Sequence, residues 1–228
     1  MLNSDFDTRA AVHAGHLDWT PSPVPGIDRR ILHHAGDEVA CATFIVRYEP
    51  GSRVASHTHR GGEEFLVLEG VLQDEHEDFP AGSYVRKPPT SSHTPRSELG
   101  CTLFVKLGQF DLNDRTEVSF DTALQAFAPV EARPGVEAMP LFADLEEQVR
   151  LERWAAGAVV DLAAPGGVEV LVLKGRFTEG GERFRPQSWL RLPAGSVMQA
   201  RAGGQGCCVW IKTGHARNTN GTPHGHPS

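Results

Sequence analysis

The length and charge of the chain exclude several classes of protein. The chain has 228 residues, which suits one large domain or two small ones at roughly 100–200 residues each. Its 22 basic and 29 acidic residues give a net charge of −7, so no overall positive field attracts phosphate backbones or anionic lipid. No apolar run reaches the roughly 20 residues of a membrane-spanning helix, and no secretory signal stands at the start. We therefore expect a cytoplasmic protein with neither a nucleic acid nor a membrane as partner.

Short strands are the elements that the sequence predicts along the chain. The 24 glycines and 16 prolines are spread evenly, which is typical of strands joined by tight turns. Alternating or apolar runs predict strands at 42–48, 63–68 and 102–107. Residues 111–133 are expected to form a linker with one helical turn, and the polar end, 217–228, to be disordered. The pattern indicates an all-β sandwich or barrel.

The sequence carries the same plan twice. Residues 61–70, GGEEFLVLEG, correspond to residues 166–175, GGVEVLVLKG, at an offset of 166 − 61 = 105. Later segments of the two copies also match, at the same offset or at an offset larger by one residue. A repeat that spans most of the chain predicts two copies of one β-rich domain. We place the copies at 1–128 and 129–216.

Two blocks of spaced residues in the first copy indicate a metal site. His57 and His59 stand two apart on a predicted strand, so both imidazoles leave the same face, as a bidentate metal clamp requires. A histidine pair alone is a weak signal, and the residues around it strengthen it. The first block reads Gly51, five residues, His57-Thr58-His59, three residues, Glu63, six residues, Gly70, and the second reads Gly82, five residues, Pro88-Pro89-Thr90, two residues, His93.

These blocks resemble the two signature motifs of the cupin superfamily, G-x5-H-x-H-x3,4-E-x6-G and G-x5-P-x-G-x2-H-x3-N. The second block departs at Thr90 and Ser97, where glycine and asparagine are usual. The stretches WTPSPVPG and EDFPAGSYVRKPPTSSHTP are similar to the ChrR-like cupins, the metal-binding domain type of ChrR anti-sigma factors. The resemblance implies two tandem cupin barrels of the double-stranded β-helix or jelly-roll type, a bicupin. The metal ligands that it implies are His57, His59, Glu63 and His93.

Comparison of the two copies tests this ligand set. The corresponding positions of the second copy hold Leu162, Ala164, Val168 and Met198, so all four ligands are lost together. Glu64 is matched by Glu169, whereas Glu63 is matched by Val168, which favours Glu63 as the ligand. Lys106 recurs as Lys212, which favours a packing or ion-pair role. We therefore predict one metal in the first barrel and a degenerate second barrel without metal ligands.

Three imidazoles and one carboxylate can bind one divalent transition metal ion. Zinc and iron are the metals expected first, and manganese, nickel and cobalt are also compatible with these ligands. Tetrahedral zinc with all four ligands engaged would make a closed structural or sensory site. Six-coordinate iron would leave two adjacent positions for dioxygen and a chelating substrate. The sequence leaves the choice of metal open.

Two functions follow from the resemblance. The first is a metal-binding sensor or regulatory protein related to anti-sigma factors. The zinc-holding anti-sigma pattern H-x3-C-x2-C is absent from the sequence, so we expect no sigma factor as partner. The alternative is a mononuclear non-haem iron(II) dioxygenase that cleaves a small diketone or hydroxyketone, because acetylacetone-cleaving dioxygenases are relatives of the ChrR-like cupins. A small-molecule ligand or substrate and a monomeric or homodimeric state are compatible with both functions.

Overall fold

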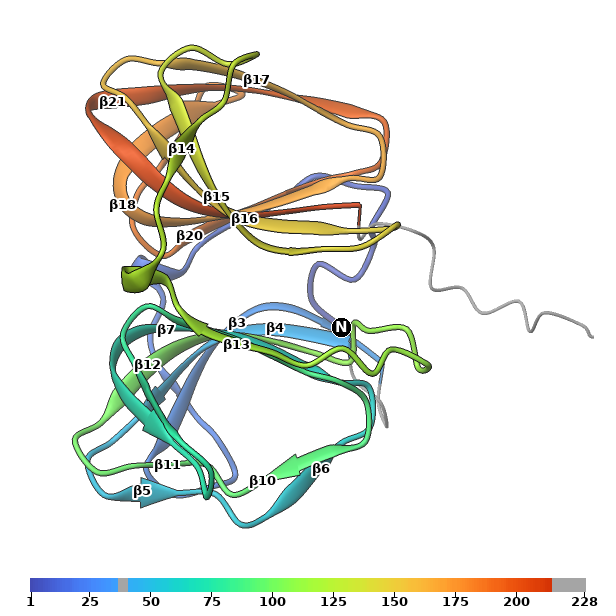
Figure 1. The fold of residues 1–228 in the computed structure, drawn as a ribbon, viewed down its shortest axis with the longest axis vertical. Coiled ribbons are helices and arrows are strands. Elements are labelled where there is room, and N and C mark those ends of the chain that lie inside the picture. Colours follow the sequence, from blue (N-terminus) through green and yellow to red (C-terminus); the bar gives the residue numbers. More distant parts are fainter. Residues whose placement is uncertain (37–40, 215–228) are drawn as a thin grey trace, which may run out of the picture.

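Two β-barrels, stacked one on the other, make up the fold (Figure 1). The computed structural model describes residues 1–36 and 41–214, so the end that was predicted to be disordered, 217–228, lies outside the described residues. Helix within that part is confined to two 3₁₀ turns, η1 (Ala14–His16) and η2 (Thr122–Leu124). None of the described helices has the length and apolar character needed to cross a bilayer. The all-β prediction, with two jelly-roll barrels in tandem, is confirmed.

The first barrel contains, among the described residues, a ten-stranded sheet and a separate two-stranded sheet, β6–β10. The main path of the larger sheet runs β13-β9-β7-β12-β4-β3-β2. The small sheet lies on the side of the barrel that faces away from the second barrel (Figure 1). The strands are β2 (Thr20–Pro21), β3 (Ile27–Ala35), β4 (Cys41–Tyr48), β5 (Ser52–Arg53), β6 (His57–His59), β7 (Glu63–Gln73), β8 (Asp78–Pro80), β9 (Ser83–Lys87), β10 (Ser91–His93), β11 (Arg96–Ser97), β12 (Cys101–Leu107) and β13 (Val118–Asp121).

The second barrel repeats this plan in a nine-stranded sheet, counted over residues 1–36 and 41–214. Its main path runs β1-β20-β18-β21-β16-β15-β14, and β21 is long enough to pair with both β16 and β17. The strands are β1 (Ala10–His13), β14 (Ala128–Pro129), β15 (Val136–Ala143), β16 (Gln148–Trp154), β17 (Val159–Ala164), β18 (Val168–Glu179), β19 (Glu182–Phe184), β20 (Ser188–Leu192) and β21 (Ser196–Thr213).

One strand from the start of the chain crosses to the second barrel, and one strand near the boundary between the copies joins the first barrel. β1, at the start of the chain, pairs antiparallel with β20 of the second barrel. β13, which leads into the second copy, pairs antiparallel with β9 of the first barrel. The segment predicted as a linker with one helical turn, residues 111–133, holds strands β13 and β14 as well as the expected turn, η2. Strand β1 therefore ties the start of the chain to the second barrel.

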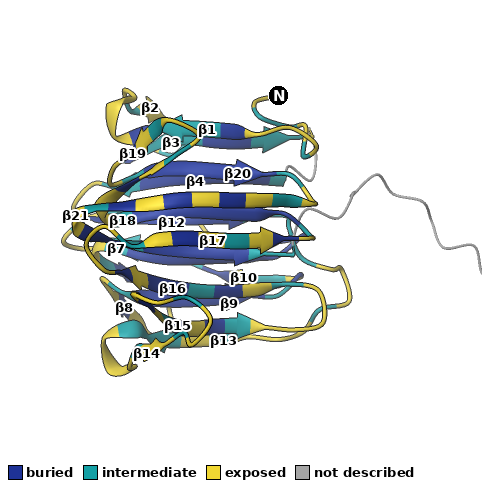
Figure 2. Cartoon of the chain, turned by 90° about the horizontal axis from the view of Figure 1, so that it is seen from above, coloured by how far each residue is buried: buried dark blue, intermediate teal, exposed yellow. Residues whose placement is uncertain are grey.

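Several central strands are buried on both faces. In β7, Phe65 and Val67 belong to the interior core of the first barrel, while Leu66 belongs to the apolar core between the barrels. β4 alternates in the same way, with Phe44 inside and Ile45 at the interface. Because side chains along a strand alternate between faces, burial on both sides makes these strands nearly continuous apolar runs. Figure 2 shows β4 and β20 buried along most of their length.

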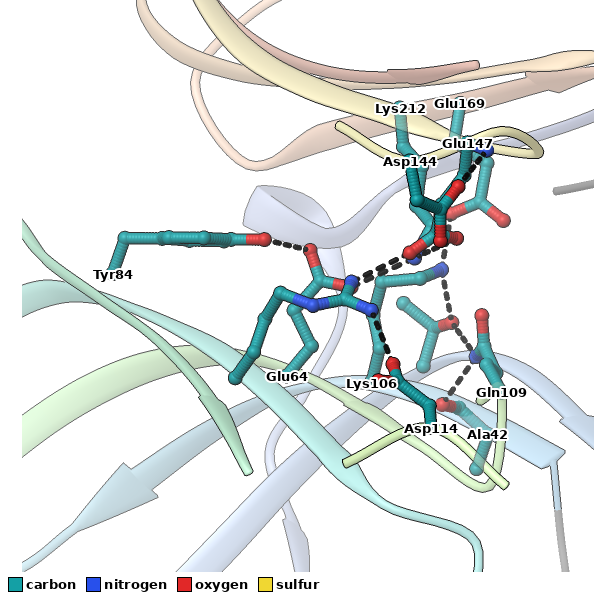
Figure 3. A network of polar contacts seen from close by, with 12 residues as sticks. Ala42, Glu64, Tyr84, Lys106, Gln109, Asp114, Asp144, Glu147, Glu169 and Lys212 are labelled. Atoms are coloured by element: carbon teal, nitrogen blue, oxygen red, sulfur yellow. Dashed lines mark hydrogen bonds and ion pairs between the residues drawn. The ribbon is translucent and has the colours of Figure 1, made fainter. Parts of the chain in front are cut away.

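A charged network crosses the apolar interface (Figure 3). Lys106 of the first barrel pairs with Glu169 of the second, and Lys212 of the second pairs with Glu64 of the first at 2.8 Å. Glu147 also binds Lys212, at 2.7 Å. Burial alone would raise the pKa of Glu64, but Lys212 and a neighbouring arginine lower it below its usual value. The lysines and glutamates that recur in both copies therefore join the barrels through reciprocal ion pairs, which agrees with the predicted ion-pair role of the lysines.

Replacement of Lys212 by methionine tests this interface. The variant takes the ammonium partner from the buried Glu64 and the partly buried Glu147, which keep only Arg86 as a cationic ion-pair partner among the described residues. Breaking a buried ion pair on one side is costly, so we expect the free energy of unfolding in urea to fall by about 3 kcal/mol. Lys174 is exposed and offers a matched control. Lys174→Met is expected to change the free energy of unfolding by less than about 0.5 kcal/mol. Equal stability of the two variants would contradict the role assigned to Lys212.

Candidate metal centre

The three histidines predicted as ligands meet inside the first barrel. His57 and His59 lie on β6 and His93 on β10, and the antiparallel register places His93 directly opposite His57. Ligand nitrogens of all three lie within 4.8 Å of one another. His59 and His93 are buried, with exposed fractions of 8% and 2%, whereas His57 is partly exposed. The structure thus brings together side chains that are up to 36 residues apart in the chain, 93 − 57 = 36.

Glu63 completes the cluster from strand β7. Its Oε2 atom lies 3.3 Å from His59 Nε2 and 3.4 Å from His93 Nε2. The two Nε2 atoms are 2.9 Å apart. Glu63 has the same parity along β7 as Phe65, which faces the barrel interior, while Glu64 points into the interface between the barrels. Alternation along one strand thus separates the two adjacent acids, as their different matches in the second copy indicate.

Burial sets the protonation states of the cluster. Burial, with repulsion from His93 and His57, lowers the pKa of His59 to about 3. Burial, with His57 and Lys87 adding to it, lowers the pKa of His93 to about 4. Burial raises the pKa of Glu63 to about 8. Near neutral pH the two buried imidazoles are therefore neutral, each with one unprotonated nitrogen, and the carboxyl group carries a proton.

The donor set fits a divalent cation. Glu63 Oε2 is buried and has no hydrogen-bond partner within the described residues, although it lies close to two imidazole nitrogens that also point into the cluster. A buried carboxyl oxygen without a hydrogen-bond partner costs free energy in a dry interior. A cation at the centre of these donors would satisfy it, and imidazole and carboxylate are ligands that zinc and iron both accept.

The turn that carries His93 keeps its shape despite the two departures from the family motif. Thr90 replaces the usual glycine and still adopts a left-handed backbone, with φ at 74°. Its N–H donates to the His59 carbonyl oxygen at 2.9 Å, which ties the turn to strand β6. Ser97 replaces the usual asparagine, is buried, and donates from Oγ to the Val71 carbonyl oxygen at 2.6 Å. Neither departure removes His93 from the cluster.

The second barrel is filled with apolar side chains where the first has its cluster. Val168, Met198 and Ala164 are almost completely buried in the interior core of that barrel, and Leu162 packs against it. These are the residues that match the four predicted ligands. The described residues of that barrel form no further cluster of histidine, cysteine and acidic side chains of the kind seen at His57, His59 and His93.

The sequence did not predict that Asp74 and Lys87 lie together beside the cluster. Asp74 has a fully buried carboxylate whose Oδ2 atom lies 3.2 Å from Lys87 Nζ and 3.6 Å from His93 Nδ1. The run Gln73-Asp74-Glu75 after Gly70 is compatible with the barrel mouth, but an acidic run is more typical of a solvated face, so Asp74 does not stand out in the sequence. A signal was available for Lys87, because Leu192 takes its place in the second copy, alongside the loss of the ligands.

Two stacked jelly-roll barrels with a histidine and glutamate cluster inside one of them define a bicupin. The model of the family described as "ChrR Cupin-like domain" matches residues 7–111 and again residues 115–217. The chain therefore belongs to the ChrR cupin-like family, and it carries two copies of that domain.

One sequence relative and two solved structures show what the chain is similar to. The anti-sigma-E factor ChrR of Cereibacter sphaeroides is 36% identical over 75 residues, which are 33% of this chain and 34% of that protein, so the match spans about a third of the relative. A candidate dioxygenase from Nostoc punctiforme matches 97% of this chain and 88% of its own at 12% identity, with a TM-score of 0.75. The Escherichia coli pirin YhhW, solved with nickel(II), matches 91% and 99% at 16% identity, with a TM-score of 0.64. Structural likeness at such identities shows the fold alone.

Proton release on metal binding tests the protonation states of the cluster. A metal needs the carboxylate form of Glu63, whose pKa of about 8 keeps it protonated below that pH. The imidazoles of His59 and His93, with pKa values of about 3 and 4, are already deprotonated at neutral pH. At roughly pH 7, addition of Zn²⁺ to the metal-free protein should release about one proton from Glu63 per metal bound.

A pH indicator in weakly buffered solution measures this release. Glu63→Gln removes the titrating group, so its release per bound metal should be lower by about one proton. Glu69→Gln on the same strand changes an exposed side chain and should behave as the wild type. Equal proton release from Glu63→Gln and the wild type would contradict the assignment.

Proposed function

We propose that this protein binds one divalent transition metal ion in its first barrel, and that His57, His59, Glu63 and His93 hold it. The observation that carries the proposal is the convergence of three histidine nitrogens within 4.8 Å, with an orphaned buried carboxylate oxygen beside two of them. The apolar filling of the matching positions in the second barrel supports one metal per chain.

The chain's own residues prepare the site for a cation. Burial keeps His59 and His93 neutral, so each presents a lone pair without first losing a proton. The carboxyl group of Glu63 supplies the negative charge once its proton leaves. The surrounding apolar core of the first barrel, which includes Phe65 and Phe79, limits access of water to the buried side of the cluster.

The regulatory function is the one that we assign first. Membership of the ChrR cupin-like family and the 36% identity to a ChrR anti-sigma factor over 75 residues support it. In this role zinc with all four ligands engaged would hold β6, β7 and β10 together, and its loss or exchange would be the signal. A metal that binds only the folded state stabilises it by an amount that grows with the logarithm of its affinity.

An iron(II)-dependent dioxygenase is the second candidate, and the exposure of His57 favours it. His57 is the only one of the three histidines that is not buried, so the cluster is open to solvent on that side. A bound iron ion would supply activation of dioxygen and of a small chelating diketone or hydroxyketone. His57, His59, Glu63 and His93 would hold that ion, and the open side would admit the substrate.

Metal content of variants tests the site. His59→Ala removes a buried nitrogen donor that lies against both His93 and Glu63, so we expect metal per chain, measured by elemental analysis, to fall from about one to near zero. His16→Ala removes an exposed histidine outside the cluster and should leave the content unchanged. Full metal occupancy in His59→Ala would remove this residue from the ligand set.

The identity of the metal separates the two functions. Protein purified without oxygen and without a tag should contain about one zinc per chain, resistant to chelator, if the site is regulatory. About one iron per chain, together with oxygen uptake when small diketones are added, would instead establish the dioxygenase function. Oxygen uptake by His59→Ala at the wild-type rate would contradict the dioxygenase function, because the activity would then not depend on this cluster.

A further inference from the structure

Asp74 faces the metal cluster from behind His93. The imidazole of His93 has two nitrogens with different surroundings. Its Nε2 atom points at His59 Nε2, 2.9 Å away, and at Glu63 Oε2, 3.4 Å away. Its Nδ1 atom points at Asp74 Oδ2, 3.6 Å away. One ring thus joins the cluster to a buried carboxylate.

We propose that Asp74 is a positioning residue that fixes the ring of His93, with the proton on Nδ1 and the lone pair of Nε2 directed into the cluster. This inference rests on the proposed metal site, in which Nε2 is the donor atom. A carboxylate behind a ligating histidine fixes its tautomer and orientation and raises its basicity.

The carboxylate of Asp74 is itself held in place. Its Oδ1 atom accepts from the backbone N–H of His76 at 2.8 Å and of Glu77 at 3.1 Å. Its Oδ2 atom lies 3.2 Å from the ammonium group of Lys87, whose side chain is buried beside it. With one oxygen engaged by the turn, only Oδ2 is left to face His93.

Both facing atoms lack a hydrogen-bond partner of their own. Asp74 Oδ2 and His93 Nδ1 are buried, and each is without a hydrogen bond among the described residues. The ion pair with Lys87 neutralises the charge of Asp74, but buried polar atoms rarely lack a hydrogen bond altogether. A small rotation of the imidazole would bring Nδ1–H into hydrogen-bonding distance of Oδ2, which satisfies both atoms at once.

The second barrel shows what becomes of this arrangement where no metal ligands remain. At the offset of 105, Asp74, Lys87 and His93 correspond to Glu179, Leu192 and Met198. Leu192 and Met198 lie in the interior core of the second barrel, while Glu179 binds Arg9 at 2.9 Å near the surface. The acid no longer faces the interior once the histidine is gone. A buried lysine and aspartate add little to stability on their own, so their place beside His93 supports a role in the site.

The position of the proton on His93 is the direct test. Nitrogen-15 NMR of the metal-free protein near neutral pH distinguishes Nδ1–H from Nε2–H for each histidine. The proposal predicts Nδ1–H for His93 in the wild-type protein. Nε2–H in the wild type would overturn it, and this measurement needs no variant to fold.

Asp74→Asn replaces the acceptor oxygen that faces His93 Nδ1 by a hydrogen-bond donor. Because the two backbone N–H groups need the oxygen of the new amide, its NH₂ group takes the place of Oδ2 and donates toward His93 Nδ1. We expect His93 to change to Nε2–H, and the affinity for Zn²⁺, measured in competition with a chromophoric chelator, to fall by about 10- to 100-fold. Asp78→Asn removes an exposed carboxylate of the same hairpin and should change neither quantity.

The two readouts separate this inference from the proposed function. If Asp74→Asn shifts the proton of His93 but even the wild type binds no Zn²⁺, the metal site fails and the positioning by Asp74 stands. If Asp74→Asn keeps the wild-type tautomer and the wild-type affinity for Zn²⁺, the positioning role is wrong while the metal site stands.

Discussion

Burial of the central strands on both faces is the constraint on which the rest of the structure depends. Along such a strand every residue must face either the interior of its barrel or the other barrel. Strand β7 sends Glu63 inward to the histidine cluster and Glu64 outward to Lys212. Strand β9 likewise sends Arg86 to the interface, 2.6 Å from Glu147, and Lys87 to Asp74 inside the barrel. One alternation therefore separates the residues of the site from those that join the barrels.

This separation explains why the two copies diverged in one set of residues and kept the other. The interface residues serve both barrels at once, since Lys106 binds Glu169 and Lys212 binds Glu64, so a loss in either copy removes an ion-pair partner from a buried charge of the other copy. The interior residues serve only their own barrel. The second barrel could therefore fill its interior with Met198 and similar apolar side chains without weakening the contact to the first.

Much of the fold was predictable because its signals are local or repeated. The duplication, the short strands and the H-x-H pair on β6 are visible in short segments. Strand pairings between distant segments could not be predicted from the sequence. Nothing local indicates that β1 joins β20 or that β13 joins β9, because edge pairing depends on how the barrels stack. Asp74 reads as part of a solvated acidic run, and only the three-dimensional turn brings it behind His93.

The central claim is that one metal lies in the first barrel and none in the second. Anomalous X-ray diffraction from crystals of the protein, recorded on both sides of the absorption edge of the metal it contains, locates that metal directly. The account predicts a single site per chain, bounded by His57, His59, Glu63 and His93. A peak of similar height among Leu162, Ala164, Val168 and Met198, or no peak beside the three histidines in a metal-loaded crystal, would contradict it.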